Sequence, residues 1–243
     1  MPRFSLIVPA HNEERYLPRL LDSVDRARDA YPGGRDAIEV VVADNASTDA
    51  TAELAFARGC RVAPVEKRAI AAARNGGGAL ATGEILCFTD ADGRIHPDTF
   101  AAIERAVDSG RYVAGATGVV MERWSPGIVL TFAVFLPMVW AAGMDSGVVF
   151  CRRADFDAVG GYDESRLYAE DVAFLWMLKR RGRATGRRLV RLAGVKTIAS
   201  ARKFDEHGDW HYFTQMPRLA WRMLFRKSAS TEWAERYWYR PER

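Results

Sequence analysis

Two aspartates spaced one residue apart are the residues of this chain best suited to chemistry. Asp90 and Asp92 come directly after the apolar run Ile-Leu-Cys-Phe at residues 85–88. Residues i and i+2 of an extended segment point the same way, so both carboxylates can face one site. Two such charges favour a nearby cation, and their hard oxygens suit Mg²⁺ or Mn²⁺. The alternative is that both aspartates cap a turn before Pro97.

The elements that must position this pair alternate between strand and helix over the first hundred residues. Apolar runs predict strands at residues 4–8, 38–42, 61–64 and 85–89, and helical spacing predicts helices at 12–28, up to 57, and at 70–81. This alternation is typical of βαβ units whose parallel sheet is covered by helices on both faces. In such sheets ligands bind at the carboxyl ends of the strands, which is where the two aspartates fall.

The second half of the chain is less regular. We predict helices at residues 97–107 and 170–181 and strands at 112–121 and 148–151. Residues 128–144 are uncharged, but Pro137 interrupts them and a membrane span needs about 20 apolar residues. We therefore expect a buried or interfacial helix there. The sequence contains no low-complexity linker, so we expect one domain over residues 1–243.

Cysteine content indicates a reducing compartment. Cys60, Cys87 and Cys151 are odd in number and widely separated, and the last two lie in apolar runs, which favours buried, reduced thiols. Residues 1–9 enter a strand pattern directly and do not resemble a secretory leader. From these features we expect a cytoplasmic protein.

The charge is distributed unevenly along the chain. Residues 1–178 carry 18 basic and 25 acidic side chains, whereas residues 179–243 carry 17 and 6. The basic end predicts an anionic partner, but no nucleic-acid-binding motif accompanies it, so we expect no nucleic acid. Residues 209–227 interleave basic and aromatic side chains in a predicted helix. This helix could make a peripheral contact with an anionic membrane or pack as the last helix of the domain, and both readings stay open.

Several segments, taken in order, resemble the family 2 glycosyltransferases. These segments are SLIVPAHNEE at 5–14, VVADNASTDAT at 41–51, ARNGGGALATGE at 73–84 with DAD at 90–92, GGYDE at 160–164, and ED at 170–171. The resemblance covers roughly residues 3–182. It implies a GT-A fold, that is, a Rossmann-like, mostly parallel sheet sandwiched by helices. It also implies a nucleotide-sugar-binding half at 1–95, an acceptor-binding half at 96–243, a divalent cation and inversion at the anomeric carbon.

The resemblance assigns the nucleotide to the loops after the first two strands. The loop from Pro9 to Glu13 can meet the base or ribose, His11 can stack on the nucleotide, and Asp44 can accept a hydrogen bond from a pyrimidine imide. The alternatives are that His11 is an ordinary loop residue and that Asp44 caps a turn through Ser47. Gly76–Gly78 lack the lysine of a phosphate-binding loop, and we expect them to allow close packing of helix on sheet.

The diphosphate and the cation complete the donor site. Arg68 and Arg74 follow the family pattern of a basic residue near the diphosphate, for which the guanidinium fork is suited; either could instead be a solvated surface residue. Asp92 is the expected metal ligand, with Asp90 oriented toward the donor ribose or sugar or toward the metal. Beyond residue 182 the resemblance is weaker, and only SARKF at 200–204 and HG at 207–208 suggest Arg202 as a diphosphate contact and His207 as a third metal ligand.

Glu170 and Asp171 open a predicted helix, where the helix dipole favours carboxylates. The resemblance implies that Asp171 is the general base for the acceptor hydroxyl and that Glu170 binds the acceptor beside it. The alternative is a pair of helix-capping residues.

Together these features predict a metal-dependent inverting glycosyltransferase that acts in glycan or glycolipid biosynthesis. The expected donor is a UDP-sugar, with GDP-sugars as the second choice, and the acceptor is a saccharide, a lipid-linked sugar or a small molecule. Two other functions stay open at this point: a nucleotidyltransferase of sugar phosphates, and a non-catalytic relative that binds nucleotide or glycan.

Overall fold

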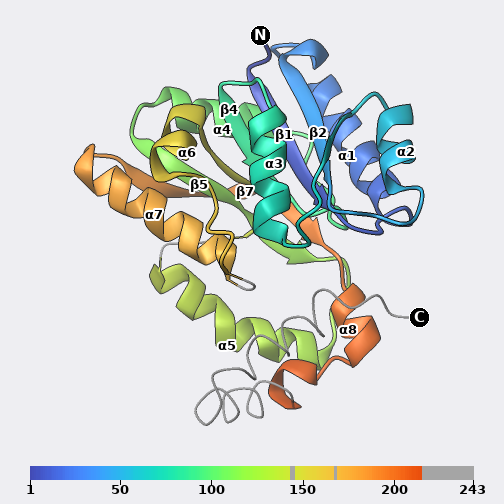
Figure 1. Ribbon diagram of the computed structural model, residues 1–243. Helices are drawn as coiled ribbons and strands as arrows, with labels where there is room; N and C mark the ends of the chain where they lie inside the picture. Colours follow the sequence, from blue (N-terminus) through green and yellow to red (C-terminus); the bar gives the residue numbers. More distant parts are fainter. Residues whose placement is uncertain (143–145, 167–168, 215–243) are drawn as a thin grey trace.

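The fold is built around one seven-stranded sheet. The computed structural model describes residues 1–142, 146–166 and 169–214. The strands are ordered β3-β2-β1-β4-β6-β5-β7, and all neighbours pair in parallel except β6, which is antiparallel to both β4 and β5 (Figure 1). Their bounds are β1 Phe4–Ala10, β2 Ile38–Asp44, β3 Arg61–Pro64, β4 Ile85–Phe88, β5 Tyr112–Met121, β6 Val149–Arg152 and β7 Arg188–Ala199.

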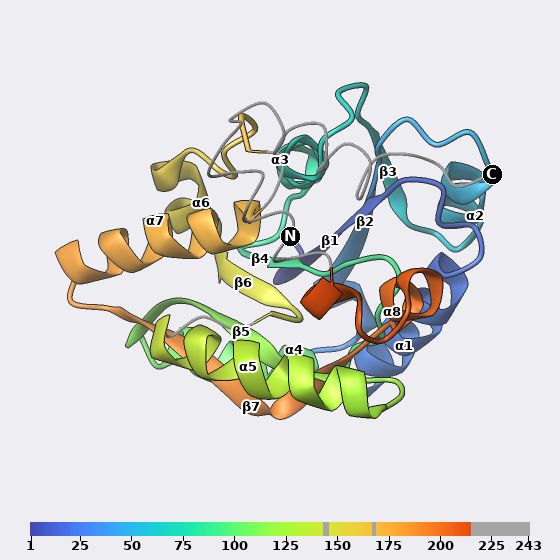
Figure 2. The ribbon, with the colours of Figure 1, turned by 90° about the horizontal axis from the view of Figure 1, so that it is seen from below.

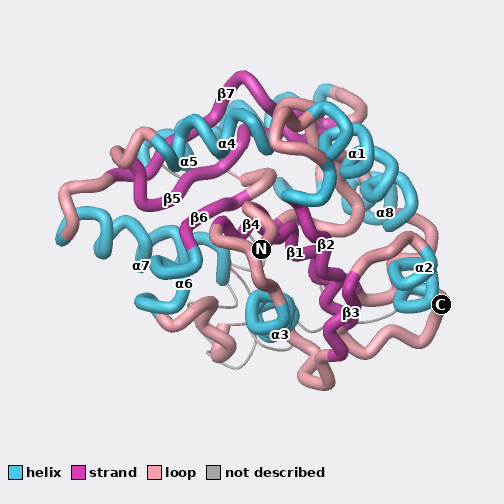
Figure 3. The backbone as a smooth tube through the Cα atoms, turned by 90° about the horizontal axis from the view of Figure 1, so that it is seen from above, coloured by secondary structure: helices cyan, strands magenta, loops and turns pink. Residues whose placement is uncertain are grey.

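Helices cover both faces of this sheet. Figure 3 shows α3, α6 and α7 on one side of the strands and α1 and α4 on the other. The predicted α/β sandwich with a mostly parallel sheet is therefore confirmed. The helices are α1 Leu17–Ala30, α2 Thr51–Ala57, α3 Ile70–Leu80, α4 Thr99–Asp108, α5 Pro126–Ala142, α6 Arg153–Val159, α7 Glu170–Ala184 and α8 Arg202–His207, with a 3₁₀ turn at Arg35–Ala37.

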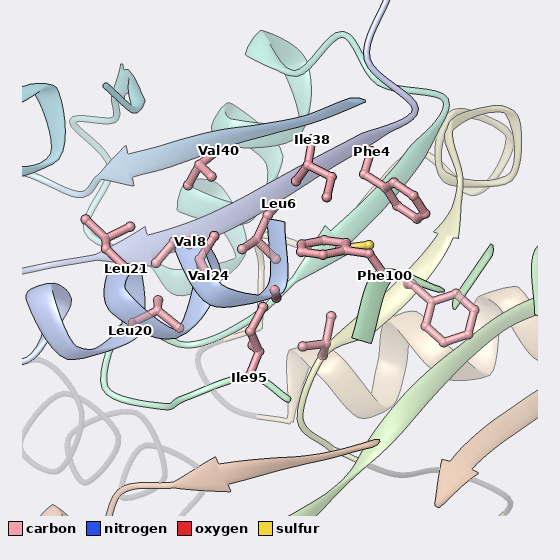
Figure 4. Packing of buried hydrophobic residues seen from close by; sticks show 14 of the residues in the cluster. Phe4, Leu6, Val8, Leu20, Leu21, Val24, Ile38, Val40, Ile95 and Phe100 are labelled. Carbon is pink, nitrogen blue, oxygen red and sulfur yellow. The ribbon is translucent and has the colours of Figure 1, made fainter. Parts of the chain in front are cut away.

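Alternation along the strands creates two cores. Phe4, Leu6 and Val8 face α1 and α4 and pack with Phe100 and its neighbours (Figure 4). Ile7 points to the opposite face, where it meets α3 and belongs to the cluster that also holds Phe88. Because both faces are apolar, the central strands are near-continuous hydrophobic runs, as expected for a sheet buried on both sides.

A third, smaller cluster joins α5 to α8 beyond the carboxyl ends of the strands. Met121, Ile128, Ala201 and Phe204 pack together there, and Figure 1 shows α5 and α8 below the sheet. Among the described residues, no helix has both the length and the apolar content to cross a bilayer. Most of the basic aromatic helix expected at 209–227 lies outside the described residues, and with it the predicted membrane contact.

The differences from the predicted elements have local causes. The first helix begins at Leu17, not at residue 12, with Pro18 in its first turn, where the missing N–H costs nothing. The second helix starts at Thr51, whose backbone N–H donates to the side chain of Asp49 at 3.0 Å. Strand β7 and helix α6 were not predicted, and only Val195 and Thr197 of β7 are buried.

Candidate active site

A cavity of about 210 Å³ opens at the carboxyl edge of the sheet, where β1 and β4 end. Figure 2 looks onto this edge from the side of α5 and α8. Two larger hollows lie at the amino ends of the strands and beside β7. Of these three hollows in the described part of the chain, the one at the carboxyl edge contains the paired aspartates. Its wall is formed by Pro9, Ala10, His11, Glu13, Asn45, Arg68, Ile70, Ala73, Asp90, Ala91, Asp92 and Lys203.

The structure brings Asp90 and Asp92 to one cavity, as predicted, although the chain turns at residues 91–92 and is not extended there. They follow β4 in a turn, and the side chain of Asp90 is 65% exposed while that of Asp92 is only 23% exposed. Burial raises the pKa of Asp92, Arg202 opposes this rise and Asp90 adds to it. Ionised Asp92 therefore needs a positive partner, which in this structure is the guanidinium of Arg202 at 3.4 Å.

Arg202 links the first and last parts of the described chain. One of its nitrogens donates to both carboxylate oxygens of Glu13 at 3.0 Å, and the guanidinium lies 4.9 Å from the ring centre of Tyr16. Burial, with added repulsion from Asp92 and Asp90, raises the pKa of Glu13 to about 7 despite the nearby arginine. Burial alone would lower the pKa of Arg202, but Glu13 and Asp92 leave it raised.

The other end of the cavity combines polar and basic groups. His11 places Nδ1 2.9 Å from the carbonyl oxygen of Asn45 and Nε2 2.7 Å from a nitrogen of Arg68. Lys203 contributes a second cation to the wall. Asp44 accepts a hydrogen bond from the backbone N–H of Ser47 at 3.3 Å, so the turn-capping alternative for this residue is confirmed; its nucleotide contact stays a prediction.

Arg74 lies beneath the cavity. It donates to Glu170 at 2.8 Å and to Asp90 at 3.1 Å, and its side chain is 9% exposed. The alternative of a solvated surface arginine is therefore wrong for this residue, and its contact with the diphosphate stays a prediction. The side chain of Glu170 is equally buried, which raises its pKa, and Arg74 opposes that rise.

Asp171 follows Glu170 at the start of α7, as predicted, and accepts a hydrogen bond from the backbone N–H of Val172 at 2.8 Å. The preceding residue, Ala169, has a φ of 54°. In the described part of the chain, Asn12 and Ala46 are the other non-glycine residues with positive φ, and both lie in loops beside the cavity. Such strain typically persists where the surrounding structure fixes a functional site.

The donor chemistry of Asp90 and Asp92 fits a divalent cation of the Mg²⁺ or Mn²⁺ class. Their carboxylate oxygens are hard ligands, and a site with few protein ligands leaves positions for phosphate oxygens and water. No group of three or more His, Cys, Asp or Glu side chains that could enclose a metal occurs among the described residues. His207 lies at the end of α8, with its ring centre 5.7 Å from that of His211 and outside the cavity wall. Its metal role stays a prediction.

Sequence reasoning missed three features of the site: Glu13 as the partner of Arg202, Lys203 and Asn45 in the wall, and Arg74 as a buried link. The first two come from residues distant in sequence. A signal for the third was present, because helix 70–80 contains one charged residue among small apolar ones. Small apolar residues around an arginine indicate a closely packed stretch, and a buried arginine must be paired.

Comparison with known proteins identifies the kind of fold and the family. Residues 5–129 match the model of "Glycosyl transferase family 2". The poly(ribitol-phosphate) beta-N-acetylglucosaminyltransferase TarS of Staphylococcus aureus is 32% identical over 114 residues, which are 44% of this chain and 19% of TarS. The chain thus spans about a fifth of that relative.

Solved structures share the architecture. Residues 1–349 of S. aureus TarS superpose with a TM-score of 0.65 at 24% identity, covering 86% of this chain and 63% of that one. The mannosyltransferase PcManGT of Pyrobaculum calidifontis, solved with GDP-Man and Mn²⁺, has a TM-score of 0.63 at 26% identity over 81% of this chain and 56% of its own. The glucosyl-3-phosphoglycerate synthase of Mycobacterium tuberculosis, solved with UDP and Mn²⁺, has a TM-score of 0.59 at 22% identity, covering 85% and 75%.

Proposed function

Because this chain belongs to glycosyl transferase family 2, we propose that it transfers a sugar from a nucleoside diphosphate donor to an acceptor hydroxyl, with inversion at the anomeric carbon. The observation that carries the proposal is the cavity that Asp90 and Asp92 share with Arg68 and Lys203. It provides paired carboxylates for a divalent cation and basic groups for a diphosphate within one small volume.

On the donor side, we assign the nucleotide to the loop from Pro9 to Glu13 and to Asn45. Arg68 and Lys203 supply positive charge for the diphosphate, and Arg202 is poised at the edge of the same cavity. Asp92 and Asp90 would hold the cation, with His207 as a further candidate ligand. When bound, the cation neutralises charge that develops on the departing nucleoside diphosphate, a contribution of several kcal/mol.

On the acceptor side, Asp171 accepts the proton of the attacking hydroxyl. It lies in the first turn of α7, next to the buried Glu170. General-base catalysis of this kind contributes about 10²- to 10⁴-fold to the rate. Glu170, buried beside it, orients the acceptor or the base.

The donor is assigned by class. TarS has been solved with UDP-GlcNAc and PcManGT with GDP-Man. We favour a UDP-sugar for this chain because Asp44 can pair with a pyrimidine imide, and a GDP-sugar is the second choice. The acceptor class is a saccharide, a lipid-linked sugar or a small metabolite, and the reaction then belongs to glycan or glycolipid synthesis. Membership of glycosyl transferase family 2 argues against the alternative function, a nucleotidyltransferase of sugar phosphates.

A thermal-shift screen tests the proposal. UDP, GDP and their common sugars are each added with and without Mn²⁺, and a ligand at 100 times its Kd adds about 2.7 kcal/mol of stability. We expect one nucleotide and its sugar to stabilise the protein, with Mn²⁺ enhancing the effect, and that sugar nucleotide to be hydrolysed slowly. Binding without any turnover, with candidate acceptors present, would instead favour the non-catalytic relative, and no binding would contradict the proposal.

A further inference from the structure

Arg74 is a buried arginine that joins the donor side of the site to the acceptor side. Its two terminal nitrogens donate to different carboxylates: one to Glu170 at 2.8 Å and the other to Asp90 at 3.1 Å. Arg74 and Glu170 are each 9% exposed, whereas Asp90 is 65% exposed. The fork therefore has one fixed partner inside the protein and one partner that solvent or a ligand can reach.

The surroundings of Arg74 hold it in place. Its guanidinium lies 5.1 Å from the ring centre of Tyr162, and that ring stacks on Phe174 of α7 with centres 4.0 Å apart. Asn75, the next residue of α3, fixes the backbone of Tyr162 by accepting from its N–H at 2.8 Å and donating to its carbonyl oxygen at 2.9 Å. Arg74 is thus held against the loop at residues 160–164 and against α7.

This position separates Arg74 from the cavity. The wall includes its neighbour Ala73 but not Arg74, and the basic side chains that do line the wall are Arg68 and Lys203. A charged side chain with this burial also needs its carboxylate partners, because an unpaired buried charge is strongly unfavourable. Arg74 would have to break its pairs to reach a diphosphate.

Building on the proposed function, we propose that Arg74 is a positioning residue that couples donor binding at Asp90 to the arrangement of Glu170 and Asp171. When Asp90 turns toward the donor or its cation, Arg74 loses that partner and its charge is balanced by Glu170 alone. The first turn of α7, which carries both acceptor carboxylates, is then held more tightly. Thermodynamic linkage requires the reverse effect as well, so a disturbed α7 would weaken the response to the donor.

The electrostatics agree with this geometry. Burial raises the pKa of Glu170, and Arg74 is the main group that opposes the rise, while Asp171 and Asp90 add to it. Without Arg74, a buried carboxylate next to Asp171 would lose its counter-ion. It would then become neutral or move, and Asp171 would lose its fixed neighbour.

The test compares Arg74→Met and Arg74→Lys with the wild type. Isothermal titration measures the affinities for UDP and UMP with Mn²⁺ (or GDP and GMP, whichever nucleotide the wild type binds). Hydrogen exchange of residues 169–175 is followed with and without the diphosphate, and donor hydrolysis reports turnover. In R74M we expect the UDP and UMP affinities to change together without a selective loss for UDP, because Arg74 acts through Asp90 and not on the β-phosphate. We also expect loss of the nucleotide-induced protection in 169–175 and about 100-fold slower turnover. R74K keeps the positive charge but lacks the two-pronged guanidinium, and it should recover part of the protection in 169–175 and part of the turnover.

Arg187 provides a matched control. It donates to the buried carboxylate of Asp155 at 2.7 and 2.8 Å, near the other end of α7 and away from the cavity. Arg187→Met should lower stability but keep the response of residues 169–175 to nucleotide. If R74M does not fold, the double variant R74M/E170Q removes both buried charges and should show the same lost response.

Two results would overturn the inference. A fall of about tenfold or more in UDP affinity with unchanged UMP affinity, as expected on losing a charge-assisted hydrogen bond, would make Arg74 a diphosphate ligand. A normal response of residues 169–175 together with normal turnover would make it a structural residue only. A wild-type protein that binds neither diphosphate would instead overturn the proposed function itself.

Discussion

Replacement of Glu13 by glutamine should change how the stability of the protein depends on pH. In the folded protein the Glu13 side chain is 11% exposed, and burial beside Asp92 and Asp90 raises its pKa from 4.5 to about 7. Between these two pH values the folded state holds a proton that the unfolded chain has lost. Wild-type stability should therefore fall as the pH rises through this window, whereas glutamine has no proton to lose.

The expected change in the free energy of unfolding follows from the pKa values of Glu13 in the unfolded and in the folded protein. Their difference corresponds to about 3 kcal/mol, most of which is expressed between pH 5 and pH 8.5. Relative to E13Q, the wild type should lose about 2 to 3 kcal/mol of unfolding free energy over that range. Urea unfolding at both pH values, with EDTA and without nucleotide, measures the difference.

A control separates this effect from the loss of one negative charge in the loop. Glu14 is the exposed neighbour of Glu13, and Glu14→Gln removes a carboxylate without removing the buried one. If the stabilities of E13Q and the wild type stayed parallel from pH 5 to 8.5, Arg202 would fully compensate the burial of Glu13. The electrostatic account of the acidic cluster would then be wrong.

Three further variants test other parts of the site. Asp171→Asn should slow sugar transfer or donor hydrolysis by about 10²- to 10⁴-fold with unchanged nucleotide affinity by calorimetry; full activity would assign the base elsewhere. Arg202→Met removes the cation that now neutralises Asp92, so Mn²⁺ without nucleotide should bind more tightly, as followed by electron paramagnetic resonance; an unchanged Mn²⁺ affinity would show that Arg202 does not compete with the metal. Phe88→Ala empties the centre of an aromatic cluster, in which its ring lies 5.1 Å from that of Tyr162 and 5.6 Å from that of Phe156, and should lower the free energy of unfolding by about 3–5 kcal/mol. A loss below about 1 kcal/mol on chemical denaturation would mean that the cluster repacks.

The first hundred residues were predictable because their signals are local. Strands β1, β2 and β4 are buried apolar runs, and polar residues stand at the carboxyl end of each, at the same edge of the sheet. The expected close packing at Gly76–Gly78 is also confirmed: a Cβ atom on Gly77 would lie 2.5 Å from Cγ2 of Ile7. Beyond the first hundred residues, strand β5 was also predicted with its observed bounds, Tyr112–Met121, because it too is a mostly apolar run.

The second half could not be predicted as well, because its elements depend on distant partners. Strand β7 lies at the edge of the sheet and buries only Val195 and Thr197, while Arg188 and Lys196 are exposed, so its sequence lacks a clear apolar period. Strand β6 inserts between β4 and β5 in the antiparallel direction, which no local pattern specifies.

In the candidate site, too, the features set by neighbouring residues were predictable and the contacts between distant residues were not. The spacing of Asp90 and Asp92 was enough to bring both to one cavity. The pairing of Glu13 with Arg202 joins residues 189 positions apart in the chain, and only the resemblance drew attention to that arginine. The resemblance drew attention to Arg74 as a residue near the diphosphate, but its burial depends on how α3 packs against α7 and residues 160–164.

Metal-dependent nucleotide binding tests the central claim most directly. Isothermal titration of UDP and GDP into the wild type and into Asp92→Asn, each with Mn²⁺ and with EDTA, measures it. We predict that Mn²⁺ increases the affinity of the wild type for one of these nucleotides and that the increase is lost in D92N. Equal affinities with Mn²⁺ and with EDTA, or an undiminished effect of Mn²⁺ in D92N, would contradict the assignment of this cavity as the donor site.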